Sequence, residues 1–221
     1  MKSTQEGHKM SGSSGHFLLS LTLNNRKISL IGMSGLGKSH WSRILEQHGF
    51  ERYSCDSMIA ARLLDRCEHP EGKIGCLGQW MGLPFEPGYA QKASQYLSAE
   101  TDALKEVIAA LESADPDQKM VIDTTGSAPY TGEQIMERLR ELTLMVHLAV
   151  SESVMVRMLT RYIQSPRPVL WGEHFSQRYS ETAHEALARS YRDLLLHREV
   201  LYRKYAHISI PYDSHRTDDD E

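Results

Sequence analysis

Residues 28–39 read Ile-Ser-Leu-Ile-Gly-Met-Ser-Gly-Leu-Gly-Lys-Ser, and the last eight, Gly32–Ser39, match the pattern G-x-x-x-x-G-K-[ST] in full. The residues before the match, Ile28–Ile31, are apolar and predict a strand. The residues after it, as far as about Gln47, have the period of an amphipathic helix. A glycine-rich loop between a strand and a helix is typical of a site that holds phosphate groups, and we predict such a loop here.

This loop predicts both a nucleotide and a metal ion. Glycines let backbone N–H groups turn toward phosphate oxygens, and the start of the following helix adds a favourable dipole. We expect Lys38 to reach the β- and γ-phosphates as a catalytic group and Ser39 to bind magnesium. The predicted ATP-binding residues are Gly32, Ser34, Gly35, Gly37, Lys38, Ser39, His40 and Arg161. The alternatives are a glycine-rich turn without a ligand and, for Arg161, a surface salt bridge.

Composition and charge argue against several classes of protein. The 221 residues are 40% hydrophobic and 24% charged, which is ordinary for one globular α/β domain. The formal net charge is −4, so no overall basic field attracts nucleic acid or an anionic membrane. No apolar run approaches the roughly 20 residues that span a bilayer, and Phe17–Leu23 lacks the flanks of a signal peptide. We expect a cytoplasmic protein with neither a nucleic-acid nor a membrane partner.

The three cysteines, Cys55, Cys67 and Cys76, are odd in number and irregular in spacing. This predicts reduced thiols rather than a disulfide framework, in agreement with the same compartment. Cys67, His69 and Cys76 do not supply the four ligands of a structural zinc site.

Strand and helix patterns alternate along the chain. Strands are predicted over 17–23, 27–31, 52–54, 120–122, 144–150 and 208–210, and helices over 38–47, 57–67, 90–111, 131–142, 151–162 and 181–205. The segment 68–88, dense in Gly and Pro, predicts an irregular loop. The alternation predicts an α/β fold of three layers, with a parallel sheet flanked by helices. We divide the chain into a flexible leader (1–15), one domain (16–212, with a substrate-side region at about 56–100 and a lid at about 161–178) and an acidic tail (213–221).

Four stretches follow one another in a recognisable order. They are Ile28–Ser39, Ser54–Asp56, Val121–Ser127, and Arg167–Leu170 followed by Arg198–Tyr202. Together they resemble the shikimate kinase family of P-loop small-molecule kinases. The resemblance implies a P-loop kinase fold with a mobile lid, ATP and Mg²⁺ as cofactors, and phosphate transfer to a hydroxyl of a small molecule.

Three positions depart from the family pattern. Ser54 stands where the family has the first Asp of a D-x-D element, and Gly126 alone remains of a triple glycine. Leu97 stands where the family has an Arg that pairs with the substrate carboxylate. A buried carboxylate without a cation is costly, so we expect shikimate to be a poor substrate unless another cation covers it.

Two carboxylates are predicted to be catalytic. Asp123 ends a buried strand, and we expect it to hold magnesium or its water in place of the acid missing at Ser54. The resemblance implies that Asp56 contacts the acceptor hydroxyl, and a carboxylate there can accept its proton. The structural alternatives are that Asp123 caps the following turn and that Asp56 caps a helix starting near Ser57.

Two arginines and a glycine complete the predicted site. Arg167 lies between two prolines in the lid, and we expect it to stabilise charge on the transferred phosphate. The resemblance implies that Arg198 and Gly126 bind the acceptor, with Arg198 holding an anionic group. A solvated charge is the alternative for each arginine.

These features predict an ATP-dependent phosphotransferase that acts on a hydroxyl of a small, anionic metabolite, as a monomer or homodimer. One alternative is a kinase of a sugar acid or nucleoside. The other is a nucleotide-binding module with weak ATP hydrolysis. Asp56 and Arg198 distinguish this last class, because a binding module needs neither.

Overall fold

The computed structural model describes residues 25–68, 72–164 and 167–214. The leader, the strand predicted over 17–23 and most of the acidic tail lie outside the described residues. Five parallel strands form one sheet in the order β2-β3-β1-β4-β5. Their bounds are β1 Lys27–Ile31, β2 Glu51–Ser54, β3 Met120–Asp123, β4 Leu144–Ala149 and β5 Ile208–Pro211.

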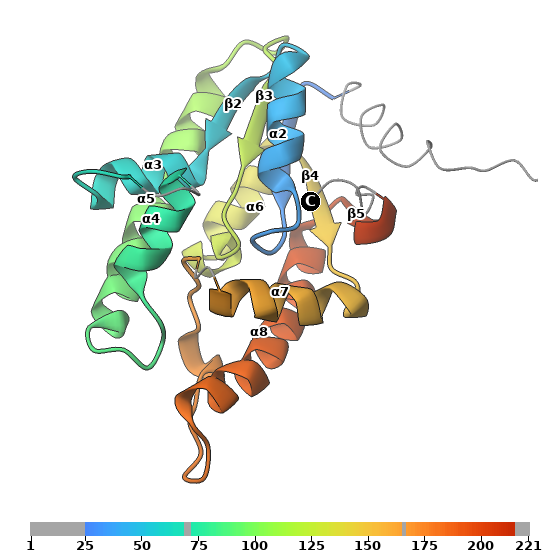
Figure 1. The fold of residues 1–221 in the computed structure, drawn as a ribbon. Coiled ribbons are helices and arrows are strands. Elements are labelled where there is room, and N and C mark those ends of the chain that lie inside the picture. Colours follow the sequence, from blue (N-terminus) through green and yellow to red (C-terminus); the bar gives the residue numbers. More distant parts are fainter. Residues whose placement is uncertain (1–24, 69–71, 165–166, 215–221) are drawn as a thin grey trace, which may run out of the picture.

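Helices cover both faces of the sheet, as predicted. They are α2 Lys38–Gln47, α3 Cys55–Leu63, α4 Gly72–Met81, α5 Tyr89–Ser113, α6 Glu133–Leu142, α7 Glu152–Gln164 and α8 Ala183–Tyr205, with short 3₁₀ turns at η1 Ala128–Thr131, η2 Gly172–His174 and η3 Tyr212–Ser214. Figure 1 shows α2 in front of the sheet and α5 and α6 behind it, and α8 packs against β4 and α6. The three-layer α/β prediction is therefore confirmed.

The central strands are buried on both faces. Consecutive residues, which point to opposite faces, have no exposed surface: Leu30 and Ile31 of β1, Val121 and Ile122 of β3, and Met145 and Val146 of β4. Such strands read as continuous apolar runs, because a parallel sheet between two helical layers has no solvated face. The rigid core thus fixes the carboxyl ends of β1, β2 and β3, where the candidate site lies.

The segment 68–88 is not the irregular loop that its Gly and Pro content predicts. It contains the helix α4, which packs against α3 and α5. Glycine disfavours an isolated helix, but Gly75 and Gly78 are buried on the packed side of α4 with Leu77 and Met81. Tertiary packing therefore overrides the local preference.

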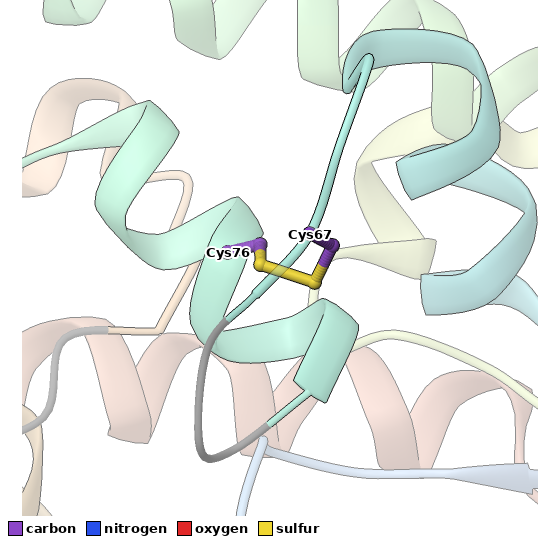
Figure 2. The surroundings of a disulfide bond; sticks show 2 residues. All are labelled: Cys67 and Cys76. Carbon is purple, nitrogen blue, oxygen red and sulfur yellow. A yellow bond between two sulfur atoms is a disulfide. The ribbon is translucent and has the colours of Figure 1, made fainter.

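The prediction of reduced thiols is wrong for two of the three cysteines. Cys67, in the segment after α3, forms a disulfide with Cys76 of α4 (Figure 2). Cys55 is free and buried. The Cα atoms of Cys67 and Cys76 are 5.7 Å apart, because α4 brings Cys76 back onto the segment that leaves α3. The spacing of Cys67 and Cys76 along the sequence does not show that the two residues lie close together in the fold. Since disulfides are typical of oxidising compartments, the thiols no longer support a cytoplasmic location.

Within residues 25–68, 72–164 and 167–214, no helix combines the length and apolar character that a bilayer crossing requires.

Candidate functional site

The loop Gly32–Ser39 joins β1 to α2 at the carboxyl end of the sheet, where ligands bind in open α/β folds. All three of its glycines have a positive φ, and two of them show why glycine is needed. Gly32 has φ 137°, and a Cβ there would lie 2.6 Å from the carbonyl oxygen of Leu148. Gly37, with φ 95°, lies at the N-cap of α2 in the left-handed region. Glycine therefore permits both the close approach to β4 and the turn into the helix.

Lys38 lies across the loop that precedes it. Its Nζ donates hydrogen bonds to the carbonyl oxygens of Gly32 (2.7 Å) and Met33 (2.9 Å), and its side chain is buried. Burial lowers the pKa of Lys38 below its usual value, while Asp123 and Asp56 offset part of this effect. A buried cation thus lies between two carboxylates, at the place where a phosphate would enter the loop.

Asp123 ends β3, and its two oxygens have different surroundings. Oδ2 accepts hydrogen bonds from Arg52 Nη2 (2.6 Å) and Ser42 Oγ (3.2 Å). Oδ1 is buried and has no hydrogen-bond partner among the described residues. No hydrogen bond in the described structure joins Asp123 to the following turn, so its contacts are not those of a turn cap. In the sheet register Asp123 lies beside Ser54, at the carboxyl ends of neighbouring strands.

The residues fit a magnesium ion. Asp123 Oδ1 is a buried acceptor without a partner, and a bound cation or its water would satisfy it. No cluster of three His, Cys, Asp or Glu side chains forms a metal site within the described chain. Magnesium bound by Ser39 and Asp123 would therefore take its other ligands from phosphate and water, as is usual for this ion.

A hollow of about 190 Å³ lies over the loop. Its lining consists of Ser34, Gly35, Gly37, Lys38, Ser39, His40, Arg43, Asp56, Ile74, Arg161 and Arg167. Every predicted ATP-binding residue except Gly32 is among them. Gly32 lies behind the loop, against β4. Arg43 and Ile74 were not predicted, and Ile74 comes from α4, which sequence reasoning missed.

A second hollow, of about 260 Å³, adjoins the first and shares Ser34, Gly35, Arg161 and Arg167 with it. Its other walls come mainly from α7 and from Tyr212. The guanidinium carbon of Arg157 lies 5.9 Å from the centre of the Tyr212 ring. A planar group and a cation thus face each other beside the phosphate loop.

Asp56 is the second residue of α3, whose N-cap is Ser54, so it does not cap the helix. Burial, and then the charge of Asp123, raises the pKa of Asp56 to about 6, although Lys38 and Arg167 act in the opposite direction. A partly buried carboxylate with this pKa, facing the phosphate loop, has the properties of a general base near neutral pH.

Arg167 reaches the phosphate loop from the predicted lid. Its Nη1 lies 3.5 Å from Ser34 Oγ, and a Cβ on Gly35 would lie 3.6 Å from the same nitrogen. The side chain is partly buried, so it is not a solvated loop charge. It lines both hollows.

Arg198 is only 2% exposed, which excludes a solvated helix face. Its Nη2 donates to the carbonyl oxygen of Leu170 (2.6 Å), and its Nη1 lies 3.3 Å from Met33 Sδ. Gly126 makes room for this arrangement, because a Cβ there would be 3.2 Å from the backbone nitrogen of Ser34 and 3.4 Å from Arg198 Nη1. The structure thus brings Gly126 and Arg198 together, with the guanidinium bonded to the protein.

Sequence reasoning assigned no role to Glu100, a fully buried residue of α5. Its carboxyl group accepts hydrogen bonds from the hydroxyls of Thr125 and Ser127 (2.7 Å for Ser127). Burial raises the pKa of Glu100 to about 8. The sequence signal that could have indicated a partner such as Glu100 is the pair of hydroxyl residues, Thr125 and Ser127, on the two sides of Gly126.

Arg52 was missed as well. It precedes Ser54 by two residues on β2, so the two side chains point to the same face of the strand. That periodicity is the signal that could have identified Arg52 as a partner of Asp123.

Leu97 lies outside the two hollows at the phosphate loop. It lines a wider hollow of about 810 Å³ with Tyr130, Leu170 and neighbouring side chains. Among its described lining residues there is no Lys or Arg. Its charged or titratable side chains are Glu173, His174, His197 and the two phenols Tyr89 and Tyr130.

No protein-family model matches the chain, and no curated protein matches it. Among solved structures it is similar to shikimate kinase from Acinetobacter baumannii in complex with shikimate. That match has 24% identity and a TM-score of 0.54, and it covers 83% of this chain and 81% of that one. Shikimate kinase from Bacteroides thetaiotaomicron matches with 18% identity and a TM-score of 0.49, over 86% of this chain and 88% of that one. The Acinetobacter likeness confirms the expected P-loop kinase fold of the shikimate kinase type.

Proposed function

We propose that this protein is an ATP-dependent kinase that transfers the γ-phosphate to a hydroxyl of a small molecule. The main support is that Lys38, Asp56 and Arg167 line one hollow at the phosphate loop. They supply a cation for the phosphates, a carboxylate for the acceptor proton and a guanidinium for the charge on the transferred group. Phosphoryl transfer needs this combination of positioning and electrostatics.

Each residue has one task in the proposed reaction. Asp56 takes the proton of the acceptor hydroxyl as the new O–P bond forms and the bond from the γ-phosphorus to ADP breaks. Lys38 stays at the β- and γ-phosphates, and Arg167 contacts the γ-phosphate from the lid. Magnesium held by Ser39 and Asp123 neutralises phosphate charge when it is bound.

The nucleotide base is assigned to the second hollow. Arg157 and Tyr212 form an aromatic and cationic pair there, and such surfaces stack on flat heterocycles. Arg161, which lines both hollows, then lies between the base and the phosphates.

The acceptor is proposed to be a small hydroxylated compound other than shikimate. Leu97 carries no charge, and no Lys or Arg is among the described residues of the hollow it lines. A kinase of a sugar acid or nucleoside is the second candidate within this class. A module that only binds nucleotide is disfavoured, because such a module gains nothing from the carboxylate of Asp56 beside Lys38.

The test measures ADP and inorganic phosphate in parallel, with ATP and magnesium, against a panel of hydroxy acids, sugars and nucleosides. A true acceptor raises ADP without an equal rise in phosphate. Asp56→Asn is expected to slow that transfer by about 100-fold or more, since general-base catalysis contributes this much. Asp65→Asn, which removes an exposed carboxylate of the neighbouring segment, is the matched control. Equal amounts of ADP and phosphate with every compound would instead identify a hydrolase or binding module.

A further inference from the structure

Three consecutive residues at the base of the lid are held by side chains from distant helices. The hydroxyl of Tyr89, at the start of α5, donates to the carbonyl oxygen of Val169 (2.7 Å) and accepts from the backbone nitrogen of Trp171 (3.0 Å). Between them, the carbonyl oxygen of Leu170 accepts from Arg198 Nη2. Three backbone groups of residues 169–171 are thus hydrogen-bonded by Tyr89 or Arg198.

The same guanidinium reaches the phosphate loop. Arg198 Nη1 lies 3.3 Å from Met33 Sδ, and its Nε lies 3.3 Å from the hydroxyl of Tyr130, over whose ring the guanidinium is stacked at 5.0 Å. Tyr202, one turn further along α8, lies 3.4 Å from Met33 Sδ and donates to the carbonyl oxygen of Gly126. One face of α8 therefore contacts the lid, the phosphate loop and the Gly126 turn.

All three nitrogens of Arg198 contact acceptors within the protein. The side chain is buried, and within residues 25–68, 72–164 and 167–214 no carboxylate forms an ion pair with it. A buried charge needs such contacts, because burial of a charged group without hydrogen bonds is strongly unfavourable. Because its three nitrogens contact protein groups, the guanidinium of Arg198 connects segments of the protein and does not bind the substrate that accepts the phosphate.

We infer that Arg198 is a positioning residue, which connects the base of the lid to the phosphate loop and so sets Arg167 over Ser34. The role rests on the proposed function, since Arg167 is the group whose position matters. Only two residues separate Arg167 from Leu170, so a shift of the Leu170 carbonyl displaces the arginine from the γ-phosphate. Arg198 thus acts on the reaction through Arg167.

The test uses Trp171 as a reporter that does not depend on catalysis. Trp171 is 1% exposed and its indole nitrogen donates to the Tyr162 hydroxyl, so release of the lid base exposes it. In a Trp41→Phe, Trp80→Phe background, Arg198→Met is expected to raise acrylamide quenching of Trp171 about twofold, as local opening does. Tyr89→Phe removes the hydrogen bonds to Val169 and Trp171 and leaves the guanidinium of Arg198 unchanged. This variant is also expected to raise the quenching of Trp171. Arg192→Met, an exposed arginine of the same helix, is the control.

Acceptor-independent ATP hydrolysis provides the second readout. Arg198→Met is expected to lower its kcat about tenfold, because displaced catalytic groups lose rate steeply, with ADP affinity little changed and Arg198→Lys giving partial rescue. If Arg198 bound the acceptor instead, Trp171 would stay protected, hydrolysis would be normal and only the acceptor KM would rise. That result overturns the inference. Should Arg198→Met fail to fold, Tyr89→Phe alone decides: unchanged quenching and hydrolysis in that variant also overturn it. Because the quenching needs no transfer reaction, it separates this inference from the proposed function.

Discussion

At Asp123 a single carboxylate faces two kinds of partner. One oxygen is bound by Arg52 and Ser42, and the other is buried without a hydrogen bond among the described residues. Pairing one oxygen with Arg52 fixes the orientation of the carboxylate. The other oxygen, Oδ1, is left to bind a cation at the phosphate loop.

We predict that Asp123→Asn raises the magnesium concentration for half-maximal activity about tenfold or more. Ser54→Ala is expected to change it less than about twofold, because a serine hydroxyl contributes little to magnesium binding. The measurement is a magnesium titration of the steady-state rate at fixed ATP.

The control for Asp123 is Arg52→Gln. It breaks the same ion pair and so reproduces any loss of stability, but it leaves the carboxylate in place. An equal rise in the magnesium requirement in Arg52→Gln would contradict a metal-binding role and assign Asp123 to structure alone.

Asp56 predicts a pH dependence of activity. Its pKa is about 6, and only the ionised carboxylate accepts a proton, so kcat/KM should fall by up to tenfold per pH unit below about 6. A carboxyl pKa that is raised on folding stabilises the fold only while the group is protonated. Stability contributed by Asp56 is therefore present at low pH and is lost as pH rises through about 6. The pH profile of Asp56→Asn should lack the acid limb, and the variant should unfold at a higher urea concentration at pH 7. An unchanged acid limb in this variant would assign the titration to another group.

The helix α4 forms although the glycines in its sequence disfavour a helix. The disulfide between Cys67 and Cys76 connects this helix to the segment that follows α3. The same helix carries Ile74 into the hollow over the phosphate loop. Closing a loop of this length stabilises a fold by about 2.5 kcal/mol in the chain-entropy model.

We predict that denatured protein without reductant reacts with one equivalent of a thiol reagent, that of Cys55. Reduction should lower the free energy of unfolding by about 2.5 kcal/mol, measured by urea titration. A Cys67→Ser, Cys76→Ser variant should match the reduced protein and be insensitive to reductant. Three reactive thiols in the unreduced protein would contradict the disulfide.

The next prediction concerns Arg167 in the lid. Arg167→Ala should lower kcat about 100-fold, the usual effect of removing a group that stabilises transition-state charge, while ADP affinity changes less than about threefold. Nucleotide binding is measured by calorimetry and kcat with the identified acceptor. If ADP affinity drops and kcat per bound complex is unchanged, Arg167 is a ground-state contact only.

At the scale of the whole molecule, the parts predicted from sequence were those with a local signal. The strand, loop and helix at residues 28–47 follow from glycine spacing and apolar periodicity, and the fold class follows from the alternation of elements. Asp123 was identified because it ends a buried strand, whereas the role of Asp56 came from the resemblance to the shikimate kinase family.

The remaining parts depend on contacts between distant residues. The disulfide, the bonds from Glu100 to Thr125 and Ser127, and those from Arg198 to Leu170 and Met33 join segments separated by up to 165 positions. No local pattern records such pairs. Arg198 was predicted as an acceptor ligand from the resemblance to the shikimate kinase family, and only the packing of α8 shows which groups its guanidinium contacts.

The most direct measurement of the central claim follows the γ-phosphate of ATP with ³²P in the presence of an acceptor panel. We predict that the wild-type protein transfers the label into a phosphate ester of a small molecule. Lys38→Ala should abolish this transfer with an unchanged circular dichroism spectrum, because it removes the cation of the β- and γ-phosphates. Label that appears only as inorganic phosphate, or transfer by Lys38→Ala at nearly the wild-type rate, would contradict the account.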